Sequence, residues 1–221
     1  MNSRETILAR IRANLGKPSG EPEEQELIAV SEYLNVHPSG PLPEGEWGDL
    51  TERFKARAKA LGSTVDEVAS MAEIPDAIRR YLDANALPNA VVCWPEFEML
   101  PWRNAGIAFN VRPVEDKDPI GITGAFCAIA ETGTLMLLSN AATRAITSLL
   151  PETHIAILNT ARICKGMEEA WNLLRVERGK VPRAVNFISG PSRTADIEQT
   201  IVIGAHGPFR VHVILVSLAS T

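Results

Sequence analysis

Apolar and polar positions along the chain follow two periods, which predicts strands interleaved with helices. Short continuous apolar runs at 89–94, 154–158 and 184–189 are typical of strands covered on both faces. Helical spacing of apolar residues, by contrast, marks 47–62 and 74–87. Further strands are expected at 63–69, 106–111, 125–131, 134–139 and 210–218, and a third helix at 163–175. This alternation predicts an α/β fold, a layered sheet with helices on both faces.

The N-terminal part has a different character from the rest of the chain. Residues 4–15 place apolar side chains at helical spacing, whereas 16–46 are rich in proline, glycine and glutamate. We therefore expect an N-terminal helix and flexible linker over 1–46 and one α/β domain over 47–221. The short helix could belong to the core, or it could dock onto another subunit.

Composition excludes several classes of protein. The chain has 221 residues, 45% of them hydrophobic, and a formal net charge of −5, which argues against disorder and against a nucleic-acid-binding protein. No apolar run approaches the length of a membrane span, and the N-terminus lacks the apolar core of a signal peptide, so we expect a cytoplasmic protein. The three cysteines and four histidines match no zinc or iron–sulfur spacing, so no metal is expected in this chain.

Two glycine-containing segments carry more polar residues than plain connections need. In 121–137, glycines allow close backbone approach, and Glu131 stands between two apolar strands. Glu131 is either an exposed acid in a simple hairpin or a carboxylate that acts as base, nucleophile or substrate clamp.

The second segment, 190–208, contains an arginine and a histidine among turn residues. Thr194 is expected to cap a helix whose first turn holds Asp196, which would explain both without a function. Ser192 and Arg193 would then form an anion site at that helix N-terminus, and His206 is either structural or a general acid/base.

Geometry suggests that the two segments meet. If 184–189 is a central parallel strand, its following loop opens at the carboxyl edge of the sheet, where ligands bind in this architecture. We therefore expect Gly190–Thr194 and Gly204–Gly207 to face Glu131–Thr134 across one pocket.

The sequences at 121–125, 128–137, 150–158 and 189–208 resemble the lactate-utilization (LUD) domain family. This resemblance implies a three-layer α/β/α, mostly parallel fold like that of glucosamine-6-phosphate deaminase, ribose-5-phosphate isomerase and coenzyme A transferases. It also implies a subunit of a multi-protein complex that oxidises L-lactate to pyruvate, with iron–sulfur clusters in partner subunits and a small anion such as lactate or pyruvate as ligand.

The motif residues that the resemblance brings over are candidates for the site. Glu131, His206 and Asp196 are the candidate catalytic residues. The candidate ligand-binding residues are Thr123, Gly124, Thr132, Gly133, Thr134, Gly190, Ser192, Arg193, Thr194 and Gly207, and Glu198 belongs to the same motif. Two alternatives stay open: a free-standing isomerase or transferase acting on a small phosphorylated or acyl substrate, and a non-catalytic scaffold subunit.

Overall fold

The structure is a computed structural model that describes residues 3–17, 22–41, 47–197 and 200–217. The chain separates into two compact units, Met1–Pro41 and Leu42–Thr221. The first unit holds helices α1 (Ser3–Asn14) and α2 (Glu24–Val36), and neither helix has a buried residue. Helix α2 lies within the segment 16–46 that the sequence predicts to be a linker. Its run lies between Pro22 and Pro38 and contains no proline or glycine, which the average composition of the segment hides.

The second unit is built on a six-stranded sheet in which every neighbouring pair is parallel. Its spatial order is β1-β12-β7-β4-β2-β3. The strands span Thr64–Val68 (β1), Ala90–Cys93 (β2), Ala108–Asn110 (β3), Ile120–Gly124 (β4), Thr153–Asn159 (β7) and Arg210–Val216 (β12). Consecutive residues of β7 and β12 are buried, which is why their sequences read as continuous apolar runs.

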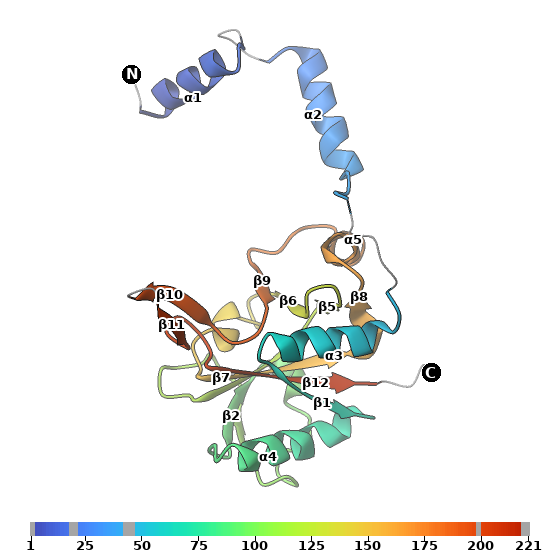
Figure 1. The fold of residues 1–221 in the computed structure, drawn as a ribbon, viewed down its shortest axis with the longest axis vertical. Helices are drawn as coiled ribbons and strands as arrows, with labels where there is room; N and C mark the ends of the chain where they lie inside the picture. Colours follow the sequence, from blue (N-terminus) through green and yellow to red (C-terminus); the bar gives the residue numbers. More distant parts are fainter. Residues whose placement is uncertain (1–2, 18–21, 42–46, 198–199, 218–221) are drawn as a thin grey trace. The chain divides into compact units, whose positions relative to one another are not determined.

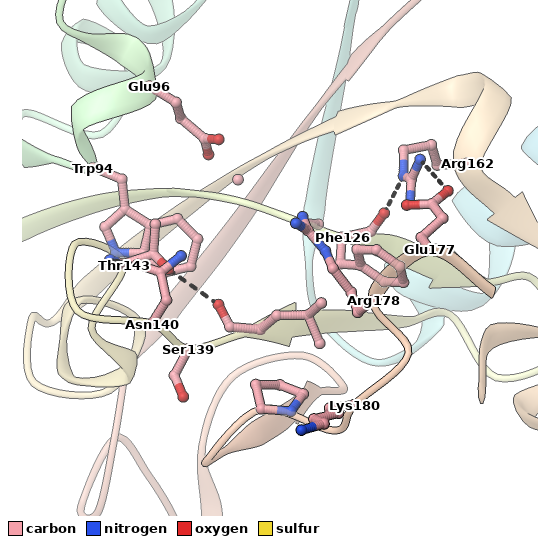
Figure 2. A pocket seen from close by; sticks show the side chains of 14 residues that line it. Trp94, Glu96, Phe126, Ser139, Asn140, Thr143, Arg162, Glu177, Arg178 and Lys180 are labelled. Carbon is pink, nitrogen blue, oxygen red and sulfur yellow. Dashed lines mark hydrogen bonds and ion pairs between the residues drawn. The ribbon is translucent and has the colours of Figure 1, made fainter. Parts of the chain in front are cut away.

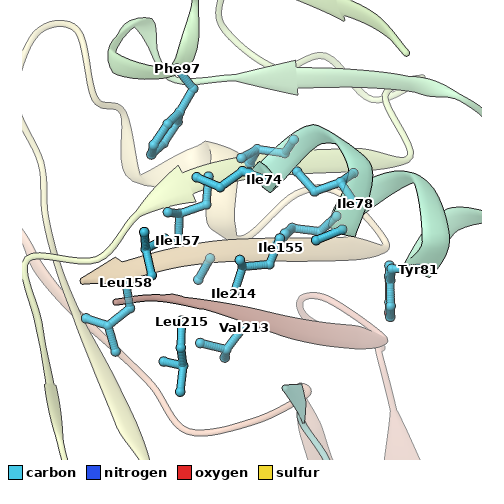
Figure 3. Packing of buried hydrophobic residues seen from close by; sticks show 14 of the residues in the cluster. Ile74, Ile78, Tyr81, Phe97, Ile155, Ile157, Leu158, Val213, Ile214 and Leu215 are labelled. Carbon is cyan, nitrogen blue, oxygen red and sulfur yellow. The ribbon is translucent and has the colours of Figure 1, made fainter. Parts of the chain in front are cut away.

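Helices cover both faces of this sheet, which confirms the predicted α/β class. In Figure 1, α4 (Ile74–Ala84) lies on one side of the sheet and α3 (Leu50–Ala60) on the other. Figure 3 shows Ile74 and Ile78 of α4 packed over Ile155 of β7. Positions four apart share one face of a helix, so the spacing seen in the sequence becomes the packing surface.

Local residues set the limits of α3. The Asp49 side chain accepts hydrogen bonds from the backbone N–H groups of Thr51 (2.8 Å) and Glu52 (3.1 Å), which caps the N-terminus. Gly62, with φ of +93°, follows the C-terminus in a conformation that favours glycine.

A second, four-stranded sheet with the order β8-β5-β6-β9 lies on the α3 side. Its strands are β5 (Cys127–Ile129), β6 (Thr134–Leu138), β8 (Ile163–Cys164) and β9 (Val185–Ile188). Helix α5 (Met167–Arg178) buries Ala170 and Leu174 against this sheet. Because Ile163 and Cys164 pair with β5, the helix expected over 163–175 begins only after Gly166.

Two sequence expectations near the C-terminus are wrong. Strand β9 is an edge strand antiparallel to β6 and has no place in the parallel sheet. The expected helix after it is a strand, β10 (Arg193–Ile197), which pairs with β11 (Thr200–Ile203). A threonine can cap a helix or sit in a strand, and here the pairing with a β-branched run decides the outcome.

Short 3₁₀ helices complete the fold: η1 (Met71–Glu73), η2 (Pro95–Phe97), η3 (Ala145–Ser148) and η4 (Thr160–Arg162). Gly121 of β4 lets η3 approach, because a Cβ at this position would overlap the carbonyl oxygen of Thr147. Among the helices in the described residues, none is both long enough and apolar enough to cross a bilayer.

Candidate functional site

The order of the parallel strands reverses direction between β2 and β4. The chain passes from β2 outward to β3, returns across β2 to β4, and continues the other way through β7 to β12. Loops that leave the carboxyl ends of two such strands diverge and open a crevice, where ligands bind in parallel sheets.

A cavity of about 470 Å³ occupies this position (Figure 2). Its size is within the range of small-molecule sites. We call it the switch-point cavity. Its lining comes from the carboxyl ends of three strands and the segments that follow them, from η4, and from the end of α5 and the residues after it. The residues are Trp94 and Glu96 after β2, Gly124, Ala125 and Phe126 at the end of β4, Leu138, Ser139, Asn140 and Thr143 at the end of β6, Arg162 of η4, Glu177 and Arg178 of α5, and Lys180 and Pro182 after α5.

The carboxyl group of Glu96 is fitted against Gly124. A Cβ at position 124 would overlap Glu96 Oε1, so the glycine leaves the space that the carboxyl group occupies. Although Glu96 is exposed as a whole residue, the protein around its carboxyl group excludes water and raises its pKa. A hydrogen bond from the Gly124 backbone opposes this rise in pKa.

The cations of the cavity are of two kinds. Arg162 already has protein partners. It forms an ion pair with Glu177 at 2.9 Å, donates a hydrogen bond to the carbonyl oxygen of Phe126, and lies 4.5 Å from the centre of the Phe126 ring. Arg178 and Lys180 have no hydrogen bond or ion pair to any residue that the structure describes. Once the Arg162–Glu177 pair is set aside, two cations face the single carboxyl group of Glu96, so the cavity favours an anion.

The loop on the opposite wall is held by its own hydrogen bonds. Asn140 Oδ1 accepts from the backbone N–H groups of Ala142 (2.7 Å) and Thr143 (2.9 Å), and Trp94 Nε1 donates to the carbonyl oxygen of Arg144 (3.3 Å). The Asn140 side-chain N–H₂ group is then available to a ligand oxygen, on a wall that is already formed.

Of the predicted site residues, Gly124 lines this cavity, whereas its neighbour Thr123 belongs to the core. Thr123 is fully buried, and its Oγ1 lies 2.8 Å from His154 Nε2. Its hydroxyl group therefore has a protein partner inside the sheet.

The turn from Glu131 to Thr134 joins β5 to β6 and is tied to neighbouring elements. Thr132 Oγ1 donates to Thr134 Oγ1 (2.7 Å), which in turn lies 2.7 Å from Ser189 Oγ at the end of β9. Gly133, with φ of +70°, lies so close to α3 that a Cβ would be 2.5 Å from the backbone nitrogen of Ala58. Thr132, Gly133 and Thr134 thus fasten the small sheet to its surroundings.

Gly190 and Arg193 lie at the C-terminal end of α3. Gly190 has φ of +81°, and a Cβ there would be 2.5 Å from the carbonyl oxygen of Leu61. Arg193 Nη2 donates to the same oxygen at 2.8 Å. The expected anion site at a helix N-terminus is therefore wrong: Thr194 and Asp196 lie in β10, and Arg193 binds the carbonyl end of a helix, where a cation is favourable.

The segments 190–194 and 204–207 lie beside each other. Ser192 donates its backbone N–H to Pro208 (2.9 Å), and Gly204 donates to Ser192 (2.9 Å). His206 and Gly207 line a second hollow with Leu149 and Phe209, beside the amino end of β12. None of the cavities found in the described residues is lined by both Glu131 and His206. The catalytic roles of Glu131, His206 and Asp196 stay predictions, and Glu198 lies outside the described residues.

Sequence reasoning missed Trp94, Glu96, Arg178 and Lys180. A signal was present, because Trp94 ends the apolar run at 89–94 and Glu96 lies two residues further on, at what becomes the carboxyl end of a buried strand. The cations at the end of α5 carried no such signal.

The three cysteines are the possible thiolate ligands for a metal in this chain. All three are buried and unbridged, and burial raises the pKa of the Cys93 thiol to about 12. The buried apolar residues among those described form two cores, a large one around the six-stranded sheet and a small one between α5 and the four-stranded sheet. Cys93 belongs to the large core, and Cys127 and Cys164 belong to the small core. In the part of the chain that the structure describes, no three His, Cys, Asp or Glu residues gather as metal ligands would.

Known proteins resemble this chain along most of its length. Residues 116–216 match the LUD domain. A lactate utilization protein C from Exiguobacterium sp. is 31% identical over 98% of this chain and 96% of its own length, and one from Shouchella clausii is 37% identical over 98% of both. The crystal structure of a DUF162 family protein from Deinococcus radiodurans aligns with a TM-score of 0.57 at 28% identity, covering 78% of this chain and 99% of that protein. The resemblance noted in the sequence motifs is thus confirmed, and the chain belongs to the LUD domain family.

Proposed function

We propose that this protein serves in lactate utilization as a component of an iron–sulfur system that oxidises L-lactate to pyruvate. In this proposal the chain holds a small carboxylate, such as lactate or pyruvate, in the switch-point cavity. The names of its relatives support the role in lactate utilization. The chemistry of the cavity supports the binding of a small anion.

The observation that carries the proposal is the pair of cations at the end of α5. Arg178 and Lys180 line a cavity of small-molecule size and make no hydrogen bond or ion pair to a described residue. A 2-hydroxy or 2-oxo acid would place its carboxylate at these cations. The hydroxyl or keto oxygen on the neighbouring carbon of the acid would then face Asn140 and Glu96, which can form hydrogen bonds with either group.

The redox centres are proposed to lie in partner polypeptides. A typical iron–sulfur cluster needs four thiolates at one place, whereas this chain has three cysteines divided between two cores. The chain would therefore bind the organic acid or support the complex, while its partners carry the clusters and the electrons.

Calorimetry with L-lactate and with pyruvate tests the ligand site. We expect binding by the full chain, and a loss of roughly 1.5–3 kcal/mol in binding free energy for Arg178→Ala, the usual contribution of a hydrogen bond to a charged group. Lys180→Ala should weaken binding in the same direction. Arg175→Ala is the matched control, because Arg175 lies on the same helix but outside the cavity lining.

Two results would count against the proposal. If Arg178→Ala and Lys180→Ala bound L-lactate and pyruvate as tightly as the control Arg175→Ala, the switch-point cavity would not be the anion site. Affinity purification of the full chain from its native host grown on L-lactate tests the other half. Recovery of the chain without any iron–sulfur protein would argue against membership in such a complex.

A further inference from the structure

We propose that Glu96 takes up a proton when an anionic ligand enters the switch-point cavity, so that the site binds its ligand and a proton together. This inference rests on the proposed function, because it concerns the same cavity. The neutral carboxyl group would donate its O–H to the ligand's keto or hydroxyl oxygen, while the cations of α5 hold the ligand's carboxylate.

The position of Glu96 is fixed by its neighbours in the fold. It lies in η2, directly after β2, between Pro95 and the buried ring of Phe97. Its carboxyl group occupies the space left by the missing side chain of Gly124. Figure 2 shows this carboxyl group directed into the cavity, and the guanidinium group of Arg178 reaching toward the same open space.

The charges facing Glu96 come from one side of the cavity only. The loop after β6 contributes the neutral residues Ser139, Asn140 and Thr143, and β4 contributes backbone and the ring of Phe126. From η4 and α5 come Arg162 with its partner Glu177 and then Arg178, and Lys180 follows two residues after the end of α5. The hydrogen bond from the Gly124 backbone is the interaction that favours an ionised Glu96, while Arg178 and Lys180 are the cations open to a ligand.

Binding of an anion favours the protonated form of Glu96. A carboxylate held by Arg178 and Lys180 adds a like charge to the cavity that Glu96 faces, and a like charge favours the protonated form of Glu96. The exclusion of water around Glu96 acts in the same direction before any ligand is present.

Titration calorimetry of the full chain with pyruvate, in two buffers of different ionisation enthalpy, counts the protons. We expect uptake of a fraction of a proton, at most one, per pyruvate bound. Above the pKa of Glu96, affinity should fall by up to about tenfold for each pH unit, as linkage requires. Glu96→Gln should bind pyruvate without proton uptake and with affinity independent of pH, because its amide is neutral and can still donate a hydrogen bond.

Matched variants separate this role from general damage. Glu98→Gln removes an exposed carboxylate outside the cavity lining and should keep the wild-type proton uptake. Gly124→Ala should displace the Glu96 carboxyl group and reduce the uptake. Gly40→Ala should change nothing, because no atom lies within 4 Å of its added Cβ.

The outcomes distinguish this inference from the proposed function. Pyruvate binding by the wild type without proton uptake would overturn the inference and leave the ligand site standing. Undiminished uptake in Glu96→Gln would overturn the assignment to this residue. Absence of binding of both pyruvate and L-lactate would overturn the ligand site and the inference together.

Discussion

Mild acid should destabilise this protein strongly, because two histidines are buried in a neutral form. His154 is fully buried, with Nε2 at 2.8 Å from Thr123 Oγ1 and no partner for Nδ1 among the described residues. His212 is 3% exposed, lies 2.8 Å from Thr64 Oγ1, and stacks on Tyr81 with ring centroids 4.0 Å apart. Burial lowers the pKa of each from 6.5 to about 4.

The sign and the size of the effect follow from proton linkage. Between pH 6.5 and pH 4 the unfolded chain binds protons that the folded protein excludes, so stability falls as the pH falls. A pKa lowered to about 4 corresponds to roughly 3.4 kcal/mol per histidine across the whole window. Between pH 7 and pH 5 the loss is roughly 2 kcal/mol for each histidine.

Urea unfolding at a series of pH values, followed by tryptophan fluorescence, measures this loss. His212→Phe keeps an aromatic ring over Tyr81 but cannot take up a proton. Its loss of stability between pH 7 and pH 5 should be smaller than that of the wild type by roughly 2 kcal/mol, at unchanged slope with urea. His206→Phe, a change in an exposed loop, is the control and should follow the wild-type curve. If His212→Phe followed the wild-type curve as well, the reasoning from burial would be refuted.

Three further outcomes are expected. Gly133→Ala should lower the free energy of unfolding by roughly 1–3 kcal/mol, because residue 133 has a left-handed backbone and an added Cβ would collide with α3. In urea titrations the control Gly40→Ala should be neutral, and equal unfolding midpoints for the two variants would contradict the packing argument. Arg193→Ala should lower stability by up to about 1 kcal/mol, through loss of the cation at the end of α3, with pyruvate affinity unchanged; weaker pyruvate binding would restore Arg193 to the ligand site. After anaerobic reconstitution with iron and sulfide the isolated chain should stay colourless, and stoichiometric iron in the purified protein would contradict the expectation drawn from its cysteines.

Local patterns in the sequence determined most of the secondary structure and the fold class. The run at 89–94 contains β2, the run at 154–158 lies within β7, and the helix expected over 74–87 is α4. These patterns are reliable because a helix or a buried strand imposes its period on neighbouring residues. The family could be inferred in the same way, since its motifs are continuous stretches of sequence.

The partner and direction of a strand are not local properties, and there the sequence reasoning failed. An apolar run such as 184–189 predicts a buried strand but does not say that β9 pairs antiparallel to β6 at a sheet edge. Likewise, Thr194 fits a helix cap as well as a strand until β11 is present to pair with β10. The predicted pocket depended on both points, so its residues divide among the core, the end of α3 and the amino end of β12.

The switch-point cavity exists only in the tertiary structure. It arises because the chain crosses over β2 to place β4 on its other side, so that the loops after these strands diverge. Gly124 could be selected from its motif, but Glu96 and Arg178 acquire a shared role only when η2 and the end of α5 meet across that crevice. The sequence by itself determined the elements and the family, and the order of the strands decided which side chains face a ligand.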